Sequence, residues 1–215
     1  MKPYDLVLWD WNGTLLDDVD VCVGCLNRLL REFGYPQQYS RSAYREIFCF
    51  PIETYYTRAG FDFSKNSFDR LAARYMEFYQ PAAESCGLTE GAGAALDAFA
   101  AAGLRQVILS ASPIDILHRQ VSERGLDRYF SELLGLSDIY AKSKVQLGLD
   151  WMARTGIDPH RAVMLGDSVH DAEVAKALGV SCVLIAAGHQ PRSVLETVGC
   201  PVVDTVDRVP ALLSI

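Results

Sequence analysis

Short apolar runs that alternate with helical patterns constrain the fold of this chain more than any other feature of its sequence. Each run has the length of a short buried strand, and several of the helical patterns between the runs stop at a glycine, a good signal for a helix end. Strands that alternate with helices are typical of right-handed βαβ units on a parallel sheet. We therefore expect an α/β fold with a doubly wound, Rossmann-like sheet that includes residues 6–9, 106–109, 162–165 and 182–185.

One segment, residues 17–83, breaks this alternation. It is poor in strand patterns, rich in Tyr, Phe and Arg, and contains leucines at helical spacing. Residues 68–79 are expected to form a helix that Pro81 ends. The simplest account is a helical cap domain inserted directly after the first strand. The predicted division is a core of residues 1–15 and 86–215 and a cap of residues 16–85.

The charge balance and the start of the chain limit its location and partners. Twenty Lys and Arg against 27 Asp and Glu give a net charge of -7, which disfavours non-specific binding to nucleic acid or to an anionic membrane. Only four consecutive apolar residues precede Asp10, too few for a signal peptide, and no apolar run approaches the ~20 residues of a membrane span. We expect a cytoplasmic protein with no nucleic-acid or membrane partner, with six free thiols, and with an oligomeric state that the sequence leaves open.

Polar residues follow three of the predicted strands at the point where each strand ends. Asp10 follows the first strand, Ser110 the second, and Gly166-Asp167 the third. In an open parallel sheet, the ligand crevice lies at these carboxyl ends, where the strand order switches. A single aspartate there could be a helix N-cap, but two aspartates and a serine that converge are less easily explained as caps. A carboxylate pair with space between its members suits Mg²⁺.

Four motifs in this order resemble the signatures of the haloacid dehalogenase superfamily of hydrolases. The run DWNGTLLD from Asp10 resembles the first signature, and QVILS, which ends at Ser110, resembles the second. Lys144 or Lys142 resembles the third, and GDSVHD from Gly166 resembles the fourth. The resemblance covers essentially the whole chain, and a helical cap after the first strand is similar to that of phosphoglycolate-phosphatase-like members.

The resemblance implies Mg²⁺-dependent hydrolysis of a small phosphomonoester, a phosphorylated metabolite. Asp10 would attack phosphorus to form an aspartyl-phosphate, and a lysine would neutralise the charge that the phosphate shares with Asp10. Asp171 would orient the groups behind the metal ligands. The implied catalytic residues are Asp10, Asn12, Ser110 and Lys144, the substrate-binding residues Gly13, Ser110, Ala111 and Lys144, and the metal ligands Asp10, the backbone carbonyl of Asn12, and Asp167.

Two lysines compete for the third motif. Lys142 lies in the register of members with a Lys-Pro signature, but no proline follows it. Lys144 resembles members whose lysine opens a helix directly, and Ser143 could cap a helix that begins there. We favour Lys144.

Position 12 departs from the pattern of the family's phosphatases, which carry a general acid–base Asp there. An amide does not exchange a proton near neutral pH, so Asn12 can position a group but cannot be an acid or base. One alternative is therefore a catalytically weak protein that binds a phosphorylated ligand. Another is a phosphonatase-like hydrolase, which has a Trp where this chain has Trp11 but needs a cap lysine, and the cap has only Lys65.

The cap should select the substrate, because the core motifs contact only the phosphate. The candidates to face the crevice share a long polar or aromatic side chain, and a solvated helix face is an equally good interpretation of them. His170 is expected at the surface, and His189 has no partner that the sequence identifies. The cap candidates are Arg41, Tyr44, Arg45, Tyr55, Tyr56 and Arg58.

Overall fold

The computed structural model describes residues 3–136 and 144–215. These residues form a parallel sheet of six strands in the order β3-β2-β1-β4-β5-β6, so the predicted doubly wound α/β fold is confirmed. The order reverses at β1, which pairs with β2 on one side and with β4 on the other. The strands are β1 (Leu6–Trp9), β2 (Arg105–Pro113), β3 (Glu132–Leu136), β4 (Ala162–Gly166), β5 (Ser181–Ile185) and β6 (Val202–Val203).

Helices cover both faces of the sheet because its central strands are apolar on both sides. Val7 and Trp9 of β1 pack on the face covered by α5, α6 and α10, whereas Leu6 and Leu8 pack on the face covered by α7 and α8. The core helices are α5 (Ala92–Ala101), α6 (Ile114–Glu123), α7 (Lys144–Thr155), α8 (Val169–Leu178), α9 (Arg192–Leu195) and α10 (Val209–Leu212). Short 3₁₀ turns are η1 (Asp127–Tyr129), η2 (Pro159–Arg161), η3 (Glu196–Val198) and η4 (Val206–Arg208).

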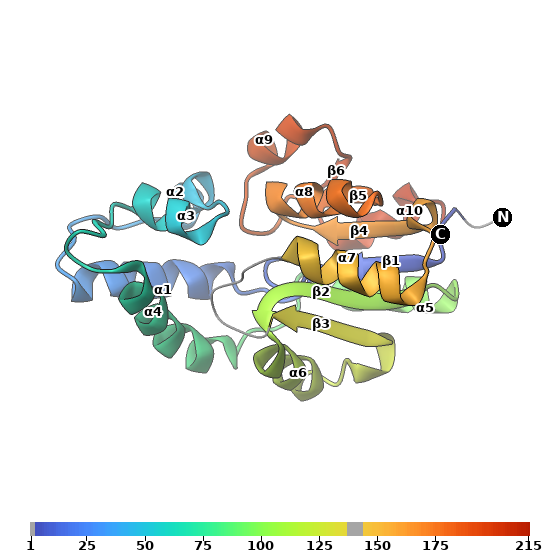
Figure 1. The fold of residues 1–215 in the computed structure, drawn as a ribbon, viewed down its shortest axis with the longest axis horizontal. Helices are drawn as coiled ribbons and strands as arrows, with labels where there is room; N and C mark the ends of the chain where they lie inside the picture. Colours follow the sequence, from blue (N-terminus) through green and yellow to red (C-terminus); the bar gives the residue numbers. More distant parts are fainter. Residues whose placement is uncertain (1–2, 137–143) are drawn as a thin grey trace.

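Four helices between β1 and α5 form what we call the helical insertion: α1 (Val19–Glu32), α2 (Arg41–Ile47), α3 (Ile52–Ala59) and α4 (Phe68–Ala83). Its buried side chains form a hydrophobic cluster of their own, and Ser40 and Ser67 cap α2 and α4 by accepting backbone N–H bonds. In Figure 1 the insertion lies beyond the carboxyl ends of the strands. The cap boundaries at 15/16 and 85/86 stay a prediction.

The two chain crossings between the core and the insertion are hydrogen-bonded to each other. The Asp17 N–H donates to the Gly87 carbonyl at 3.1 Å, and the Thr89 N–H donates to the Leu15 carbonyl at 2.9 Å. Leu16 and Leu88 form an antiparallel bridge between these bonds. The insertion therefore leaves and re-enters the core at one place.

The structure differs from the predicted elements at a few positions. Helix α4 continues through Pro81 to Ala83, because a proline near a helix end removes only one backbone bond. Strand β2 runs on past Ser110 to Pro113, with an irregular register against β3 after Leu109. All six cysteines are free, as predicted. Among the residues that the structure describes, no helix has the length and apolar character needed to cross a membrane.

Candidate active site

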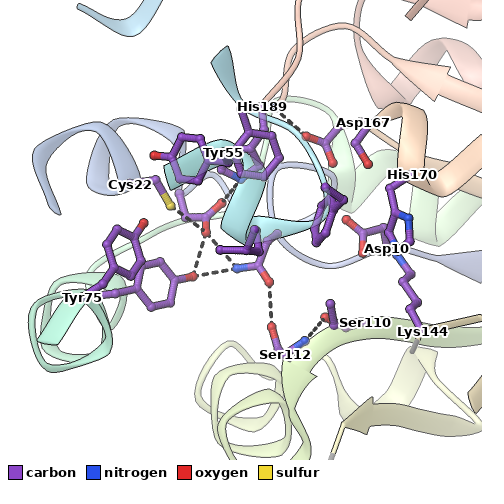
Figure 2. Close-up of a pocket in the computed structure, with 18 of the residues that line it drawn as sticks. Asp10, Cys22, Tyr55, Tyr75, Ser110, Ser112, Lys144, Asp167, His170 and His189 are labelled. Atoms are coloured by element: carbon purple, nitrogen blue, oxygen red, sulfur yellow. Dashed lines mark hydrogen bonds and ion pairs between the residues drawn. The ribbon is translucent and has the colours of Figure 1, made fainter. Parts of the chain in front are cut away.

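A cavity of about 210 Å³ lies between the carboxyl ends of the strands and the helical insertion. Figure 2 shows Asp10, Ser110, Lys144 and Asp167 on the core side, with Tyr75 on the opposite side. Of the predicted site residues, those that line the cavity are Asp10, Asn12, Ser110, Ala111, Lys144 and Asp167.

Asp10 reaches the cavity because β1 ends at the point where the strand order reverses. Its backbone N–H donates to the Leu165 carbonyl of β4 at 2.8 Å, which holds the residue at the edge of the sheet. The irregular end of β2 similarly brings Ser110 and Ser112 to the cavity, where the Ser112 N–H donates to Ser110 Oγ at 3.0 Å. Parallel strands thus place a carboxylate and two hydroxyls in one space.

Lys144, the first residue of α7, lies between two carboxylates. Its Nζ is 2.5 Å from Asp10 Oδ1 and 2.6 Å from Asp171 Oδ1, and its side chain is 2% exposed. Burial alone would lower the pKa of Lys144, but the two carboxylates outweigh burial and raise that pKa. The ammonium is therefore charged and fixed beside the predicted nucleophile. Lys142 and Ser143 lie outside the described residues.

Asp171 joins this lysine to the start of α8. Its Oδ2 accepts bonds from the Asp167 N–H, the Ser168 N–H and the Ser168 hydroxyl, as part of a capping box. Burial opposes the ionised form, but Lys144 and the Ser168 bonds outweigh it and hold the pKa of Asp171 below its usual range. Asp171 is thus held by Lys144 and by the start of α8, whereas Asp167 accepts single bonds from the Thr14 hydroxyl and the His189 N–H, and Asp10 Oδ1 contacts Lys144.

The buried carboxylates have the composition of a divalent-cation site. Oxygens of Asp10, Asp167 and Asp171 lie within 4.8 Å of one another, and all three side chains are buried around one lysine. Burial raises the pKa of Asp10 and of Asp167, and repulsion from the neighbouring Asp171 carboxylate raises both further. A cation that offers two positive charges would relieve this, and Mg²⁺ takes one or two carboxylates with water and substrate oxygens. The residues therefore fit Mg²⁺.

Gly13 builds the turn that follows Asp10. Its φ is +71°, and a Cβ there would lie 2.4 Å from Asp167 Oδ2, so a larger residue would both strain the turn and strike the carboxylate. The Gly13 N–H donates to Asp18 Oδ1 at 2.9 Å and to the Leu16 carbonyl at 2.9 Å. This N–H is therefore used within the protein, and the role of Gly13 in substrate binding stays a prediction.

Both ends of the Asn12 amide are hydrogen-bonded. Nδ2 donates to Asp18 Oδ2 at 2.8 Å and to the Tyr79 hydroxyl at 2.6 Å, while Oδ1 accepts from the Ser112 hydroxyl at 2.7 Å. Tyr79 belongs to α4, so these bonds also tie the helical insertion to the core. The amide is fixed in one orientation and carries no proton that it could give to a leaving group.

Asp18 accepts the bonds that fix this network. Besides Asn12, Gly13 and the Tyr79 hydroxyl (2.7 Å), His189 Nε2 lies 3.2 Å from Asp18 Oδ1. Burial alone would raise the pKa of Asp18, but His189 and the other donors outweigh it and hold that pKa below its usual value. Asp18 in turn overcomes the effect of burial on His189 and raises the pKa of His189 to about 9. Asp18 is thus an ionised acceptor and His189 a cation.

His189 is the site residue that the sequence analysis missed most completely. It follows β5, far along the chain from Asp10, and its backbone N–H donates to Asp167 Oδ2 at 2.5 Å. Its Nδ1 lies 2.8 Å from the Tyr44 hydroxyl of α2. Its partners are Asp167 after β4, Tyr44 of α2 and Asp18 in the loop after β1, and no local sequence pattern predicts these contacts. His170, expected at the surface, instead stacks on Phe50 at the cavity.

The residues predicted to face the crevice from the insertion divide by chemical type. The tyrosines Tyr44, Tyr55 and Tyr56 line the cavity, whereas the three arginines do not. Arg45 donates to the Ala186 and Gln190 carbonyls of the loop after β5. Lys65 is exposed, pairs with Asp62 at 3.2 Å and is not part of the cavity lining, which weighs against a phosphonatase-like reaction.

Comparison with known proteins supports the assignment made from the motifs. A family model described as haloacid dehalogenase-like hydrolase matches residues 7–185. A predicted phosphatase from Clostridium acetobutylicum has the same fold, with a TM-score of 0.84 at 21% identity over 99% of both chains. The motif-based resemblance is therefore confirmed.

Relatives of similar closeness carry names for different reactions. Phosphoglycolate phosphatase 1 of Pseudomonas aeruginosa is 26% identical over 95% of this chain and 78% of its own. The protein named tyrosine-protein kinase PtkA of Mycobacterium tuberculosis is 24% identical over 98% of this chain and 72% of its own. The substrate must therefore be argued from the residues of this chain.

Proposed function

Because the chain belongs to the haloacid dehalogenase-like hydrolase family, we propose that it is a Mg²⁺-dependent phosphatase that hydrolyses a small phosphomonoester through an aspartyl-phosphate on Asp10. The observation that carries the proposal is the position of Lys144, which lies 2.5 Å from Asp10 in a buried cluster with Asp167 and Asp171. A fixed cation beside a carboxylate at a strand end is what phosphoryl transfer to that carboxylate requires. Names of relatives such as phosphoglycolate phosphatase 1 also support a small phosphorylated substrate.

In the first step, a carboxylate oxygen of Asp10 attacks phosphorus. Lys144 holds Oδ1, and no residue that the structure describes donates to Oδ2, so we assign the attack to Oδ2. The bond from phosphorus to the ester oxygen breaks, and its electron pair leaves with that oxygen. Lys144 offsets charge on the phosphoryl oxygens, and the hydroxyl of Ser110 donates a hydrogen bond to one of them.

In the second step, water attacks phosphorus, the bond to Asp10 breaks with its electron pair on the Asp10 carboxylate, and phosphate leaves with both protons of the water. Asp10, Asp167 and the Asn12 carbonyl would hold Mg²⁺, which supplies positive charge that stabilises the phosphoryl oxygens when it is bound. Asp171 positions Lys144 throughout. The helical insertion covers part of the cavity and would limit the access of bulk water.

One observation favours a second candidate function, a binding protein with slow turnover. Asn12 stands where the family's phosphatases carry an acid–base carboxylate, and its amide is committed to Asp18, Tyr79 and Ser112. Such a site would bind a phosphorylated ligand and release product slowly. Turnover of an activated ester distinguishes the two functions.

The test is hydrolysis of p-nitrophenyl phosphate with Mg²⁺, with EDTA and by Asp10→Ala. We expect release of phosphate that EDTA stops and that Asp10→Ala reduces by several orders of magnitude, because the nucleophile is lost. Asp10→Ala activity above about 1% of wild type would reject the covalent route. Tight binding of orthovanadate without any hydrolysis would favour the second candidate.

The proposals on location and partners rest on the sequence. We propose a cytoplasmic location and a small phosphorylated metabolite as the partner. We also propose that the protein does not bind nucleic acid, which its net charge of -7 supports.

A further inference from the structure

We infer that the substrate is the phosphate ester of a phenol, with one aromatic ring bonded directly to the ester oxygen. The inference rests on the proposed phosphatase activity and names its leaving group. Two independent features support this inference. The helical insertion lines the cavity with aromatic side chains, and position 12 has no general acid.

The insertion lines its side of the cavity with aromatic and apolar groups. Phe48, Phe50, Tyr55 and Tyr75 contribute rings, and Met76 of α4 adds a flexible thioether. The rings also contact one another, with Phe48 and Tyr55 centroids 5.3 Å apart. Aromatic side chains bind a further ring through stacked and edge-on contacts, and methionine sulfur also contacts ring edges favourably. The leaving group that fits this wall is a ring.

The same wall offers no Lys or Arg for a second negative charge on the substrate, and the unpaired buried polar atom that the described lining residues do offer is the neutral Tyr55 hydroxyl. Lys144 is the only Lys or Arg among the described residues that line the cavity, and two carboxylates already hold it. The His189 ring is committed to Asp18 and Tyr44. His170 stacks on Phe50 and has Glu173 3.2 Å from its Nδ1. A carboxylate such as that of phosphoglycolate would lie unpaired near several aspartates, which is unfavourable.

The size of the cavity limits the leaving group to one ring. An apolar cavity of ~150 Å³ is enough to bind benzene. The cavity here measures about 210 Å³, which leaves room for a phosphoryl group beside the ring. Pockets for drug-sized ligands begin at roughly 300 Å³, so a nucleotide or a polycyclic ester would extend beyond this cavity.

The chemistry at position 12 independently selects a phenol. An alkoxide is about as basic as hydroxide, whose conjugate acid has a pKa of about 15.7, so an alcohol needs a proton as it leaves. A phenol has a pKa near ~10, as in tyrosine, and departs as phenolate without a donor. Asn12 cannot donate a proton in this role. When Asp10 attacks, the electron pair of the breaking phosphorus–oxygen bond stays on the phenolate, which takes its proton from water.

The test separates ring recognition from leaving-group acidity with four esters: phenyl, benzyl and ethyl phosphate, and phosphoglycolate. At saturating Mg²⁺ we expect KM for phenyl and benzyl phosphate at least about tenfold below KM for the other two, because both carry the ring. We expect kcat for phenyl phosphate to exceed that for benzyl phosphate by about 10²-fold or more, because benzyl alcohol needs the missing acid. Phosphoglycolate with a kcat/KM equal to that of phenyl phosphate would overturn the inference.

Binding of inert analogues distinguishes this inference from the proposed function. With Mg²⁺, calorimetry should give benzylphosphonate at least tenfold tighter binding than phosphonoacetate, whether or not the protein turns over. Equal affinities would reject the aromatic leaving group even if hydrolysis is observed. A tenfold preference without any hydrolysis would reject the phosphatase and leave the ligand class standing.

A matched pair of variants on α4 tests the wall itself. Ala72 lines the cavity and is half-buried, whereas its neighbour Ala73 is exposed and does not line it. Ala72→Lys should raise KM for phenyl phosphate about tenfold and lower KM for phosphoglycolate, because it adds the missing cation. Ala73→Lys should leave both unchanged. Circular dichroism would establish that both variants fold, and equal KM values for the two folded variants would contradict the inference.

Discussion

At the scale of single residues, the amide of Asn12 and the carboxylate of Asp18 form one unit. Asp18 accepts from Gly13, Asn12, Tyr79 and His189, and such a carboxylate stays ionised. It therefore fixes Asn12 and the turn after Asp10 but does not replace the missing acid. The carboxylate lies within one hydrogen bond of position 12 and acts only as an acceptor.

This pairing determines what a restored acid would do. In Asn12→Asp, two carboxylates would face each other where Nδ2 now lies 2.8 Å from Asp18 Oδ2. We expect the free energy of unfolding to fall by about 3 kcal/mol, because a buried charge is left uncompensated. Urea denaturation of wild type and variant measures this. An unchanged unfolding midpoint would show that the Asn12–Asp18 bond contributes nothing.

The exchange Asn12→Asp with Asp18→Asn tests the missing acid with less of this penalty. It retains one amide and one carboxylate in the pair but removes the carboxylate that now faces the buried His189, so stability should recover only part of the loss. Hydrolysis of benzyl phosphate should rise by roughly 10²–10⁴, the usual effect of a positioned acid–base group, and hydrolysis of phenyl phosphate should rise less. A folded double variant with the wild-type ratio of the two rates would mean that the acid is supplied elsewhere.

At the scale of elements, the site depends on where helices begin. Lys144 opens α7, and Asp171 in the first turn of α8 joins the helix cap to that lysine. The capping box satisfies backbone N–H groups at the start of α8 with Oδ2 and leaves Oδ1 for Lys144. The Asp171 carboxylate thus belongs both to the cap of α8 and to the contacts that hold Lys144.

Two variants of α8 separate these roles. Ser168→Ala removes a capping hydroxyl and should cost about 1 kcal/mol of stability with little change in kcat. Asp171→Ala also frees Lys144 from one of its two carboxylates and should lower kcat by about 10–100-fold, as loss of an outer partner of a metal site usually does. Denaturation and kcat at saturating Mg²⁺ give both readouts. An equal loss of kcat in the two variants would assign the effect to the helix end.

Much of this architecture could be predicted from local patterns, because buried parallel strands are apolar runs. The runs at 6–9, 106–109, 162–165 and 182–185 all lie in strands. Strands β3 and β6 were not predicted: β3 contains a glycine and is only partly buried, and β6 has two half-buried residues. Asp10, Ser110 and Asp167 follow from strand ends, whereas Lys144 is identified by its resemblance to a family motif.

The rest of the site depends on contacts that no local pattern contains. Asp18 and His189 meet across the whole length of the chain, and Tyr79 reaches Asn12 only because α4 packs beside α1. The residues next to Asp18, Tyr79 and His189 in the sequence do not mark any of the three as part of a site. Only tertiary packing brings them to their hydrogen-bond partners.

At the scale of the whole molecule, polar contacts hold the helical insertion over the sheet. Arg45 donates to the Gln190 carbonyl at 2.7 Å, and the Gln190 side chain donates to the Phe48 carbonyl at 2.9 Å. Together with the Tyr44–His189 and Tyr79–Asn12 bonds, these contacts join the insertion to two loops of the core. The insertion and the core each have a hydrophobic cluster of their own, so we expect these polar contacts to break and re-form while both clusters stay folded.

We therefore expect closure to depend on ligand and on Arg45. A compact chain of 215 residues has a radius of gyration of about 17 Å. Small-angle scattering of Arg45→Ala without ligand should give a larger radius than wild type, and Mg²⁺ with orthovanadate should reduce it. Arg58→Ala, on an exposed residue of α3, is the control and should match wild type. Identical radii for Arg45→Ala and wild type, with and without bound vanadate, would contradict closure.

The paired crossings at Leu15–Asp17 and Gly87–Thr89 have an evolutionary consequence. The segment between these crossings starts and ends at one place, where the two crossings are hydrogen-bonded to each other. Insertions or substitutions within it therefore need not move a strand of the sheet. Substitutions in that segment can change the cavity wall while Asp10, Lys144 and Asp167 stay in place on the core, provided that Asp18 and Tyr79 still hold Asn12. In this arrangement, substrate selectivity can evolve by changes in the insertion rather than by substitution of the core residues of the site.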